Sequence, residues 1–317
     1  MLIIGIMITT YPEEEIPDEK IDLIGVIDPG NKIINTNGNE WTLSGENIQL
    51  AIDDLDDGTV FIGGNVNLSE PIMLKQNIQV DFLNNYVTLL EDTTFVYVEK
   101  CKKAGLKNVN VNLYPQQTEP AIHLYIQDTI NSGIRYNIFE NIRLFNTGGQ
   151  HQASTGHWLY NYHAYDAILL EQFADDFCYL ENTFEQIVIE GCKSAIKFHQ
   201  PNYSKGFGNS NTFRDIWVDQ FETMIDFDVE KGIEWGFNDN HFENVKGQAT
   251  DYTRYGVKNV SKEGNHFISC LIFDWHVTTD DQPYDWIIRS DAYDTFICSH
   301  FVKILDEAPD TTYCGNI

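Results

Sequence analysis

The chain has 317 residues, of which 42% are hydrophobic and 13% aromatic, enough to bury a continuous core. Charged residues make up 21%, too few for a disordered polyelectrolyte. The 20 basic and 48 acidic residues give a formal charge of −28, which repels phosphate backbones and anionic membranes. We therefore expect a folded protein that neither binds nucleic acid nor inserts into a membrane.

Residues 1–43 are predicted to form an N-terminal extension. Its apolar start, Met1 to Ile8, is much shorter than the roughly 20 residues that a membrane-spanning helix needs. It has no basic region and no small-residue cleavage site, and acidic residues follow from Glu13 to Glu15. No conventional export signal is therefore visible, and we expect a strand or packing segment there.

A short helix is predicted at about residues 44–56, followed by a strand. Apolar residues recur there at i, i+3, i+4 and i+7, on one helix face: Ile48, Ala51, Ile52 and Leu55. Ser44 can cap the first turn, and Gly58 ends the pattern before the apolar run from Thr59 to Ile62. Further short strands are predicted at 78–82, 87–90, 95–98 and 109–113.

An Asn-x-Phe unit recurs through the second half of the chain. Its phenylalanines are Phe139, Phe184, Phe213, Phe242, Phe267 and, with Asp294 in place of the asparagine, Phe296. The basic spacing is 29 residues, as between Phe184 and Phe213, and the first interval carries an insertion. Apolar residues three and five positions after the phenylalanine predict one short strand. A second strand is predicted in each unit, at 168–170, 195–198, 224–227, 256–260 and 286–288.

A period of this kind is typical of a solenoid, in which each coil buries its apolar face only against its neighbours. We expect the phenylalanines to stack as one interior column. The residues before them, from Asn137 to Asn265 and then Asp294, should form a neighbouring polar ladder. Each asparagine amide can bond the equivalent amide one coil away, and asparagine tolerates left-handed turn geometry.

The opening of this region resembles that of pectate-lyase-like β-helix proteins, over roughly residues 44–90. The resemblance rests on the helix segment Ile48 to Asp53, the strand Gly58 to Ile62 and the segment Asn67 to Lys75. It implies an all-β fold, a right-handed parallel β-helix (solenoid) over residues 44–317 with a short N-terminal capping helix. Gly63-Gly64-Asn65 replaces the proline-glycine turn common in the family, and the paired-aspartate and Gly-His-Gly signatures of polygalacturonases are absent. Polygalacturonase chemistry is therefore not implied.

Function in such folds lies in the loops at the corners, because the strands are regular. The first loop face precedes the second strands. It gathers aromatic and histidine side chains that suit sugar rings and hydroxyls, namely His157, Trp158, His163, Tyr252 and Trp275. A subunit interface, where tyrosine and tryptophan are also enriched, is the alternative interpretation of this face.

The second loop face follows the second strands. Its ligand-binding candidates are Tyr179, Tyr203, Phe207 and Trp235, and its catalytic candidates are Asp175, Asp176, Glu234 and Asp239. If coils advance ~4.8 Å each, Asp175 and Glu234 lie ~10 Å apart, near the separation of the acid and base in inverting glycosidases. In a chain with 48 acidic residues such pairs also arise by chance, so a solvated acidic surface is the competing interpretation.

For a metal, the sequence offers a calcium site as its candidate. Asp251, Asp280 and Asp281 supply oxygen ligands, and Arg254 lies near them in the sequence. Lyase chemistry would need a base, but arginine rarely loses its proton, so a surface salt bridge is the favoured role of Arg254 and hydrolysis is favoured over lyase chemistry. No His-x-x-x-His pair on a helix supports a histidine-ligated metal. The six cysteines lack the paired spacings of a zinc site, and three in apolar runs are expected to be buried thiols, namely Cys192, Cys270 and Cys298.

The preferred function is recognition of a polysaccharide or cell-surface glycan at an extracellular or virion surface. The resemblance implies a tailspike or fibre-like receptor-binding protein, with polysaccharide depolymerase activity and a homotrimeric assembly as further expectations. A secreted polysaccharide lyase or glycoside hydrolase is the enzyme alternative. A purely structural β-helix is the third.

Overall fold

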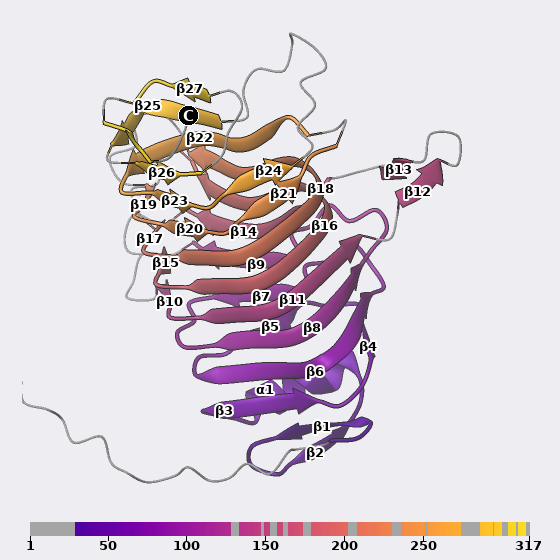
Figure 1. Cartoon of the computed structure of the whole chain (residues 1–317). Helices are drawn as coiled ribbons and strands as arrows, with labels where there is room; N and C mark the ends of the chain where they lie inside the picture. Colours follow the sequence, from indigo (N-terminus) through magenta and orange to yellow (C-terminus); the bar gives the residue numbers. More distant parts are fainter. Residues whose placement is uncertain are drawn as a thin grey trace, which may run out of the picture.

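The computed structural model describes residues 29–127, 133–146, 149–152, 157–160, 164–173, 179–201, 208–229, 236–250, 253–273, 286–293, 295–299, 304–308 and 310–314. This part of the chain contains one α-helix and 28 strands, most of them paired in parallel. Figure 1 shows the strands stacked one above another, from the indigo N-terminal end to the yellow C-terminal end. The all-β prediction is therefore confirmed. The predicted segment Met1 to Ile8 lies outside the described residues.

The N-terminal end of the stack carries a small antiparallel unit and the helix. β1 (Lys32–Asn35) pairs antiparallel with β2 (Glu40–Thr42) and with β3 (Gly58–Ile62). α1 (Gly45–Asp53) begins after Ser44, whose Oγ accepts the backbone N–H of Asn47 at 3.3 Å. Three residues of its predicted apolar face are buried, namely Ile48, Ala51 and Ile52, and α1 packs against β1 and β3. The predicted helix is confirmed and ends at Asp53.

From β3 onward, each strand of a first column pairs in parallel with the equivalent strand of the next repeat. These strands are β6 (Ile78–Leu89), β8 (Gly105–Leu113), β11 (Ile138–Asn146), β16 (Thr183–Gln200), β18 (Thr212–Val229), β20 (His241–Glu243), β23 (His266–Ile268), β26 (Phe296–Cys298) and β28 (Thr312–Tyr313). Three short strands also belong to this column. β4 (Val66–Leu68) pairs with β6, β21 (Lys246–Gln248) pairs with β18, and β24 (Leu271–Phe273) pairs with β21.

A second parallel column contains the predicted second strands. It consists of β5 (Ile72–Met73), β7 (Val96–Glu99), β9 (Ile122–Ile126), β14 (Asp166–Gln172), the C-terminal halves of β16 and β18, β22 (Tyr255–Glu263), β25 (Trp286–Tyr293) and β27 (Ile304–Asp306). A small parallel sheet holds β10 (Ile134–Arg135), β15 (Tyr179–Leu180), β17 (Gly208–Asn209) and β19 (Phe237–Asn238). β12 (Gly149–Gln152) and β13 (His157–Tyr160) form a separate antiparallel hairpin.

The chain turns its corners at residues with left-handed backbone geometry. One corner lies just before the first-column strands, at Tyr136, Glu181, Ser210, Asp239 and Gly264, with φ between 49° and 71°. Each of these residues immediately precedes a ladder asparagine, and those asparagines do not themselves have positive φ. The tolerance of asparagine for left-handed geometry is therefore not used at these positions. The residue before each asparagine makes the turn, and the asparagine side chain can then point inward.

The predicted asparagine ladder is confirmed for the five asparagines. Asn137, Asn182, Asn211, Asn240 and Asn265 are fully buried. The Nδ2 atom of Asn182 donates to Asn211 Oδ1 at 2.9 Å, and Asn211 donates to Asn240 in the same way at 2.9 Å. The same Oδ1 of Asn211 also accepts the backbone N–H of Asn182 at 3.2 Å. Each interior amide is thus bonded to the repeats on both sides.

The predicted phenylalanine column is confirmed from the first to the fifth ring. Phe139, Phe184, Phe213, Phe242 and Phe267 are buried, and successive rings stack with centroids 4.7–5.1 Å apart.

The sixth predicted position of this column is wrong by one residue. Ile297 pairs with Phe267, whereas Phe296 pairs with His266. The register of the second column also shifts between β22 and β25 in this repeat, at Val257/Val260 and Val260/Lys262. Ile297 is buried at the position that pairs with Phe267, and Thr295 is buried two residues before it. Asp294 lies outside the described residues.

Cys298 departs from its expected state, because it forms a disulfide with Cys314. Cys192 and Cys270 are buried free thiols, as predicted. None of the helices in the described residues has the length and hydrophobicity needed to cross a lipid bilayer.

Phe213→Ala tests the central position of the ring column. The substitution leaves a cavity between Phe184 and Phe242, so the free energy of unfolding should fall by about 3–5 kcal/mol in denaturant melts. Trp217→Ala is the matched control, because Trp217 lies on the outer face of the same strand with 37% of its surface exposed. The control should lose less than about 1 kcal/mol. Equal losses in the two variants would contradict a central role for the phenylalanine column.

Candidate functional site

The outward face of the second column carries a cluster of aromatic and charged side chains. Along β9, Ile122, Leu124 and Ile126 are buried, and the alternate residues His123 and Tyr125 are half-buried on the opposite face. The same alternation places other polar residues outward from β7, β14, β16 and β18. We call this set the aromatic–carboxylate surface; it comprises Tyr97, His123, Tyr125, Glu171, Phe173, Lys197, His199, Asp226 and Asp228.

Strand register brings these residues into two rows. In the first row, Tyr97 pairs with His123, His123 with Leu169, Leu169 with Lys197, and Lys197 with Asp226. In the second row, Tyr125 pairs with Glu171, Glu171 with His199, and His199 with Asp228. Residues far apart in the sequence therefore become neighbours because the repeats are stacked in register.

Ion pairs run across the surface from strand to strand. Glu171 lies between two histidines, with its Oε2 atom 3.0 Å from His123 Nε2 and its Oε1 atom 3.9 Å from His199 Nε2. Asp228 Oδ2 lies 3.0 Å from His199 Nδ1 and 3.4 Å from Lys197 Nζ. The resulting network alternates carboxylates with histidines and lysine, so each charge is partly neutralised where it is partly removed from water.

An aromatic row lies beside this network. The Tyr97 ring is 5.2 Å from His123 and 5.9 Å from Tyr125, measured between ring centroids. The row continues from Tyr125 to Phe173 at 5.7 Å and from Phe173 to His199 at 5.9 Å. All five rings are partly accessible to solvent. Ring edges and faces are therefore available to a ligand along four neighbouring strands.

The environment shifts the pKa values of the charged groups in opposite directions. The hydrogen bond to Asp228 raises the pKa of His199, and the same bond lowers the pKa of Asp228. Burial raises the pKa of Tyr97 to about 12, so that hydroxyl stays protonated at neutral pH. Burial also raises the pKa of Asp226, although Lys258 Nζ lies 3.3 Å from its Oδ2 atom. The Oδ1 atom of Asp226 is buried with no hydrogen-bond partner among the described residues.

Most of the residues predicted from the loops cannot be placed relative to this surface. The following lie outside the described residues: His163, Asp175, Asp176, Tyr203, Phe207, Glu234, Trp235, Asp251, Tyr252, Trp275, Asp280 and Asp281. His157 and Trp158 belong to β13, and Tyr179 belongs to β15. The roles assigned to all of these residues stay predictions. In the sequence, β14, β16 and β18 end at Gln172, Gln200 and Val229, directly before the predicted second loop face.

Asp239 is the catalytic candidate that the structure describes fully. It lies at the left-handed corner before β20, not on the second column, and about half of its side chain is exposed. Its neighbours are two histidines, His241 and His266, each within 3.8 Å of its Oδ1 atom. Its predicted role as an acid or base stays a prediction.

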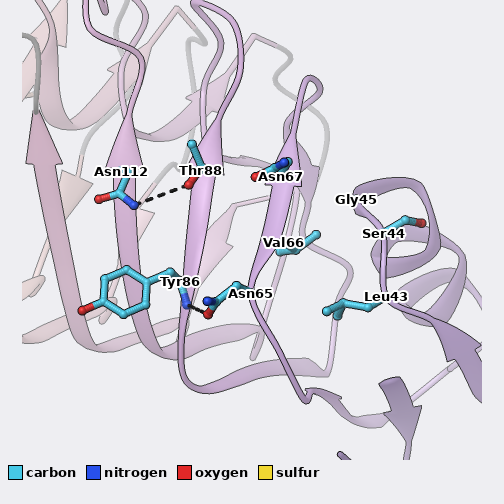
Figure 2. A pocket seen from close by; sticks show the side chains of 9 residues that line it. All are labelled: Leu43, Ser44, Gly45, Asn65, Val66, Asn67, Tyr86, Thr88 and Asn112. Atoms are coloured by element: carbon cyan, nitrogen blue, oxygen red, sulfur yellow. Dashed lines mark hydrogen bonds between the residues drawn. The ribbon is translucent and has the colours of Figure 1, made fainter. Parts of the chain in front are cut away.

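A polar pocket near the N-terminal end is a second place where a ligand could bind. It has a volume of about 500 Å³, and its lining includes Asn65, Asn67, Tyr86, Thr88 and Asn112. Figure 2 shows these side chains on neighbouring strands beside the first turn of α1. The lining contains hydroxyl and amide groups but no carboxylate, histidine or lysine. The pocket therefore lacks the carboxylate and histidine groups that could act as acid and base, and the aromatic–carboxylate surface contains both.

Comparison with known proteins gives no further guide: no protein-family model, no curated protein and no solved structure matches the chain. The function must therefore be inferred from the site itself.

The sequence contained a signal for the aromatic–carboxylate surface that the analysis of loops missed. In the second strands, charged residues alternate with large apolar ones, as in Lys197-Phe198-His199 and Asp226-Phe227-Asp228. One face of each strand is therefore polar in the same positions of successive repeats. Aligning the second strands on their buried residues, Ile196 with Ile225, would have placed these charges side by side.

The pH dependence of stability tests the pairing of His199 with Asp228. A raised histidine pKa means that protonation favours the folded state, so its contribution is complete below about pH 6.5 and is lost as pH rises through the folded pKa. The lowered pKa of Asp228 adds stability above about pH 4 that is lost on acidification. The difference in unfolding free energy between wild type and His199→Gln should therefore be larger at pH 5.5 than at pH 9.

His266→Gln provides the control in the same denaturant melts. Burial and the neighbouring His241 lower the pKa of His266, so its neutral form favours folding and the pH trend should have the opposite sign. A His199→Gln difference that grows from pH 5.5 to pH 9 would contradict the assigned pairing.

Proposed function

We propose that the chain is a right-handed parallel β-helix whose aromatic–carboxylate surface binds a polysaccharide or cell-surface glycan. The order of the strands supports the fold. From β10 to β19, each repeat supplies one strand segment to the small parallel sheet, then one to the first column, then one to the second column. We assign a right-handed coil because the connection between two parallel strands of one sheet is right-handed in about 98% of cases.

The observation that carries the glycan assignment is the continuous row of half-buried rings beside carboxylates and histidines. Sugar C–H faces stack on aromatic rings, and sugar hydroxyls bond well to charged partners. Tyr97, Tyr125 and Phe173 supply the rings, while Glu171 and Asp228 supply acceptors. Since neighbouring repeats present aromatic or polar groups ~4.8 Å apart, the surface suits an extended polymer more than a compact small molecule.

The charge of the protein narrows the glycan class. A net charge of −28 disfavours strongly anionic polysaccharides at long range. Within the surface, Lys197 and His199 are already paired with Asp228, so they do not form a free cationic patch. We infer that the ligand is a neutral or amino-sugar polysaccharide. An external role as a tailspike or fibre-like receptor-binding protein accords with the family resemblance of residues 44–90.

Hydrolysis of the bound glycan is the second candidate function, favoured by one observation. Asp226 and Asp228 lie two residues apart on the same face of β18, about 6.6 Å from Cα to Cα at the usual rise of a strand. Their pKa values are moved in opposite directions, raised for Asp226 and lowered for Asp228. This difference in pKa suits a catalytic pair in which Asp226, with the raised pKa, donates a proton and Asp228, with the lowered pKa, stays ionised.

Tyr125→Ala tests the binding assignment. The ring should contribute about 1–2 kcal/mol to stacking, so the variant should bind roughly five- to thirtyfold more weakly. The ligand for this test is the polysaccharide that wild type selects from a printed array of neutral, amino-sugar and acidic glycans. Trp217→Ala is the control, because Trp217 is 37% exposed and lies in the first-column half of β18, outside both candidate sites. Equal affinity of Tyr125→Ala and wild type would rule out the aromatic–carboxylate surface as the binding site.

The same selected polysaccharide distinguishes binding from cleavage. If the protein is a hydrolase, mass spectrometry after incubation with wild type should detect shortened polysaccharide. The Asp226→Asn variant should then bind the polysaccharide but produce no shortened fragments. Intact polysaccharide after incubation with wild type would remove the hydrolase candidate and leave the binding assignment in place.

A further inference from the structure

The corner between β19 and β20 brings two histidines and a carboxylate together on the outside of the stack. Asp239 occupies the left-handed position of that corner, with φ 49°, and His241 follows two residues later in β20. The next repeat turns the equivalent corner at Gly264, with φ +71°, and then supplies His266. A Cβ atom at Gly264 would lie 3.4 Å from Asp239 Cα, so the two repeats are in close contact here.

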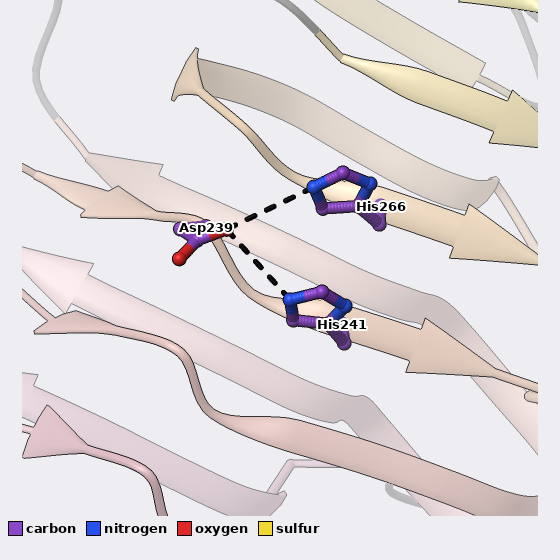
Figure 3. A group of neighbouring side chains, drawn as sticks. All are labelled: Asp239, His241 and His266. Carbon is purple, nitrogen blue, oxygen red and sulfur yellow. Dashed lines mark ion pairs between the residues drawn. The ribbon is translucent and has the colours of Figure 1, made fainter. Parts of the chain in front are cut away.

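The two imidazole rings are stacked because β20 and β23 pair in register. His241 pairs with His266, and the rings lie 4.6 Å apart between centroids and within 8° of parallel. Both rings direct Nε2 toward the same Asp239 oxygen, as Figure 3 shows. The Nε2 to Oδ1 distances are 3.7 Å for His241 and 3.8 Å for His266, longer than a direct hydrogen bond.

A neighbouring residue holds the carboxylate in this orientation. Ser210 Oγ donates a hydrogen bond to Asp239 Oδ2 at 3.0 Å, while Oδ1 remains directed at the two histidines. Ser210 is the corner residue of the preceding repeat, so three successive repeats contribute to the arrangement. Partners of this kind typically fix the orientation of a metal-ligating carboxylate.

We propose that Asp239, His241 and His266 bind a divalent transition-metal ion of the Zn²⁺ class. Two zinc ligands, each about 2.1 Å from the ion, can lie at most about 4.2 Å apart, and both Asp–His separations satisfy that limit. The three ligand atoms lie within 4.8 Å of one another, so the rings need only tilt toward the ion. The side chain of His241 is 45% exposed and that of His266 is 32% exposed. This exposure leaves room for the rings to rotate and for water to bind the ion as a further ligand.

The chemistry of the ligands fits this class of metal better than calcium. Imidazole nitrogen with one carboxylate oxygen is typical of zinc and related ions, whereas calcium takes six to eight oxygen ligands. Because His241 and His266 belong to different repeats, the bound ion would link neighbouring coils.

Calorimetric titration of the chelator-treated full chain with zinc chloride tests the proposal. We expect one site per chain and a rise in melting temperature with excess zinc, because the ion binds the folded state selectively. His266→Gln and Asp239→Asn should each weaken zinc binding at least tenfold and abolish the thermal shift. Calcium chloride at the same concentration should give neither effect.

His123→Gln is the matched control, since His123, Glu171 and His199 form the other grouping of two histidines with a carboxylate among the described residues. This variant should bind zinc as wild type does. Zinc binding that survives His266→Gln but is lost in His123→Gln would overturn the proposal. If His266→Gln does not fold, NMR spectra of the wild-type protein provide the test. Zinc should shift the imidazole signals of His241 and His266, and unchanged signals would overturn the proposal.

Discussion

The structure depends on a buried column of amide hydrogen bonds that joins each repeat to the next. An asparagine side chain without partners is costly to bury, at about 1–3 kcal/mol for each unsatisfied group. Here the Oδ1 atom of Asn211 accepts both the backbone N–H and the Nδ2 of Asn182, and its Nδ2 donates to Asn240. The requirement for full satisfaction fixes both the spacing of the repeats and their register, because a shift by one residue would leave several polar groups unpaired.

The register set by this column determines what each face of the stack presents. Inside the stack, the register places the phenylalanines directly above one another. Their rings stack in the core with nearly the same geometry in each repeat. Outside, it aligns Glu171, His199 and Asp228 on one face and His241 with His266 on another. Neither cluster is encoded by a local motif. Each arises because residues far apart in the chain, such as Glu171 and His199 or His241 and His266, occupy equivalent positions of successive repeats.

The interior could be predicted from the sequence because it repeats in residue type as well as position. Asn211 and Phe213 recur 29 residues later as Asn240 and Phe242, and the structure places both pairs as expected. The prediction was wrong at Phe296, where Thr295 and Ile297 take the inward positions and the residue types no longer repeat. Spacing alone could not reveal a shift of one residue in that coil.

The candidate site was harder to predict because the outward residues do not repeat in type. The position of His199 is occupied by Glu171 in one neighbouring repeat and Asp228 in the other, so this position is charged or polar in each repeat but its residue type does not recur. The complementarity of these charges becomes visible only once the register is known. The same is true of Asp239, because its two histidine neighbours, His241 and His266, could not be inferred from the sequence without the register of β20 and β23.

The free energy of unfolding of Asn211→Leu tests most directly whether the amide column holds the repeats in register. Leucine has nearly the same shape but removes the Oδ1 atom that accepts both the backbone N–H and the Nδ2 of Asn182. It also removes the Nδ2 donor to Asn240 Oδ1, which keeps only the backbone N–H of residue 211. The account predicts a loss of at least about 3 kcal/mol in denaturant melts. Asn112→Leu, which removes one partly exposed bond to Thr88, should lose less than about 1 kcal/mol. A loss in Asn211→Leu as small as that of Asn112→Leu would contradict the account.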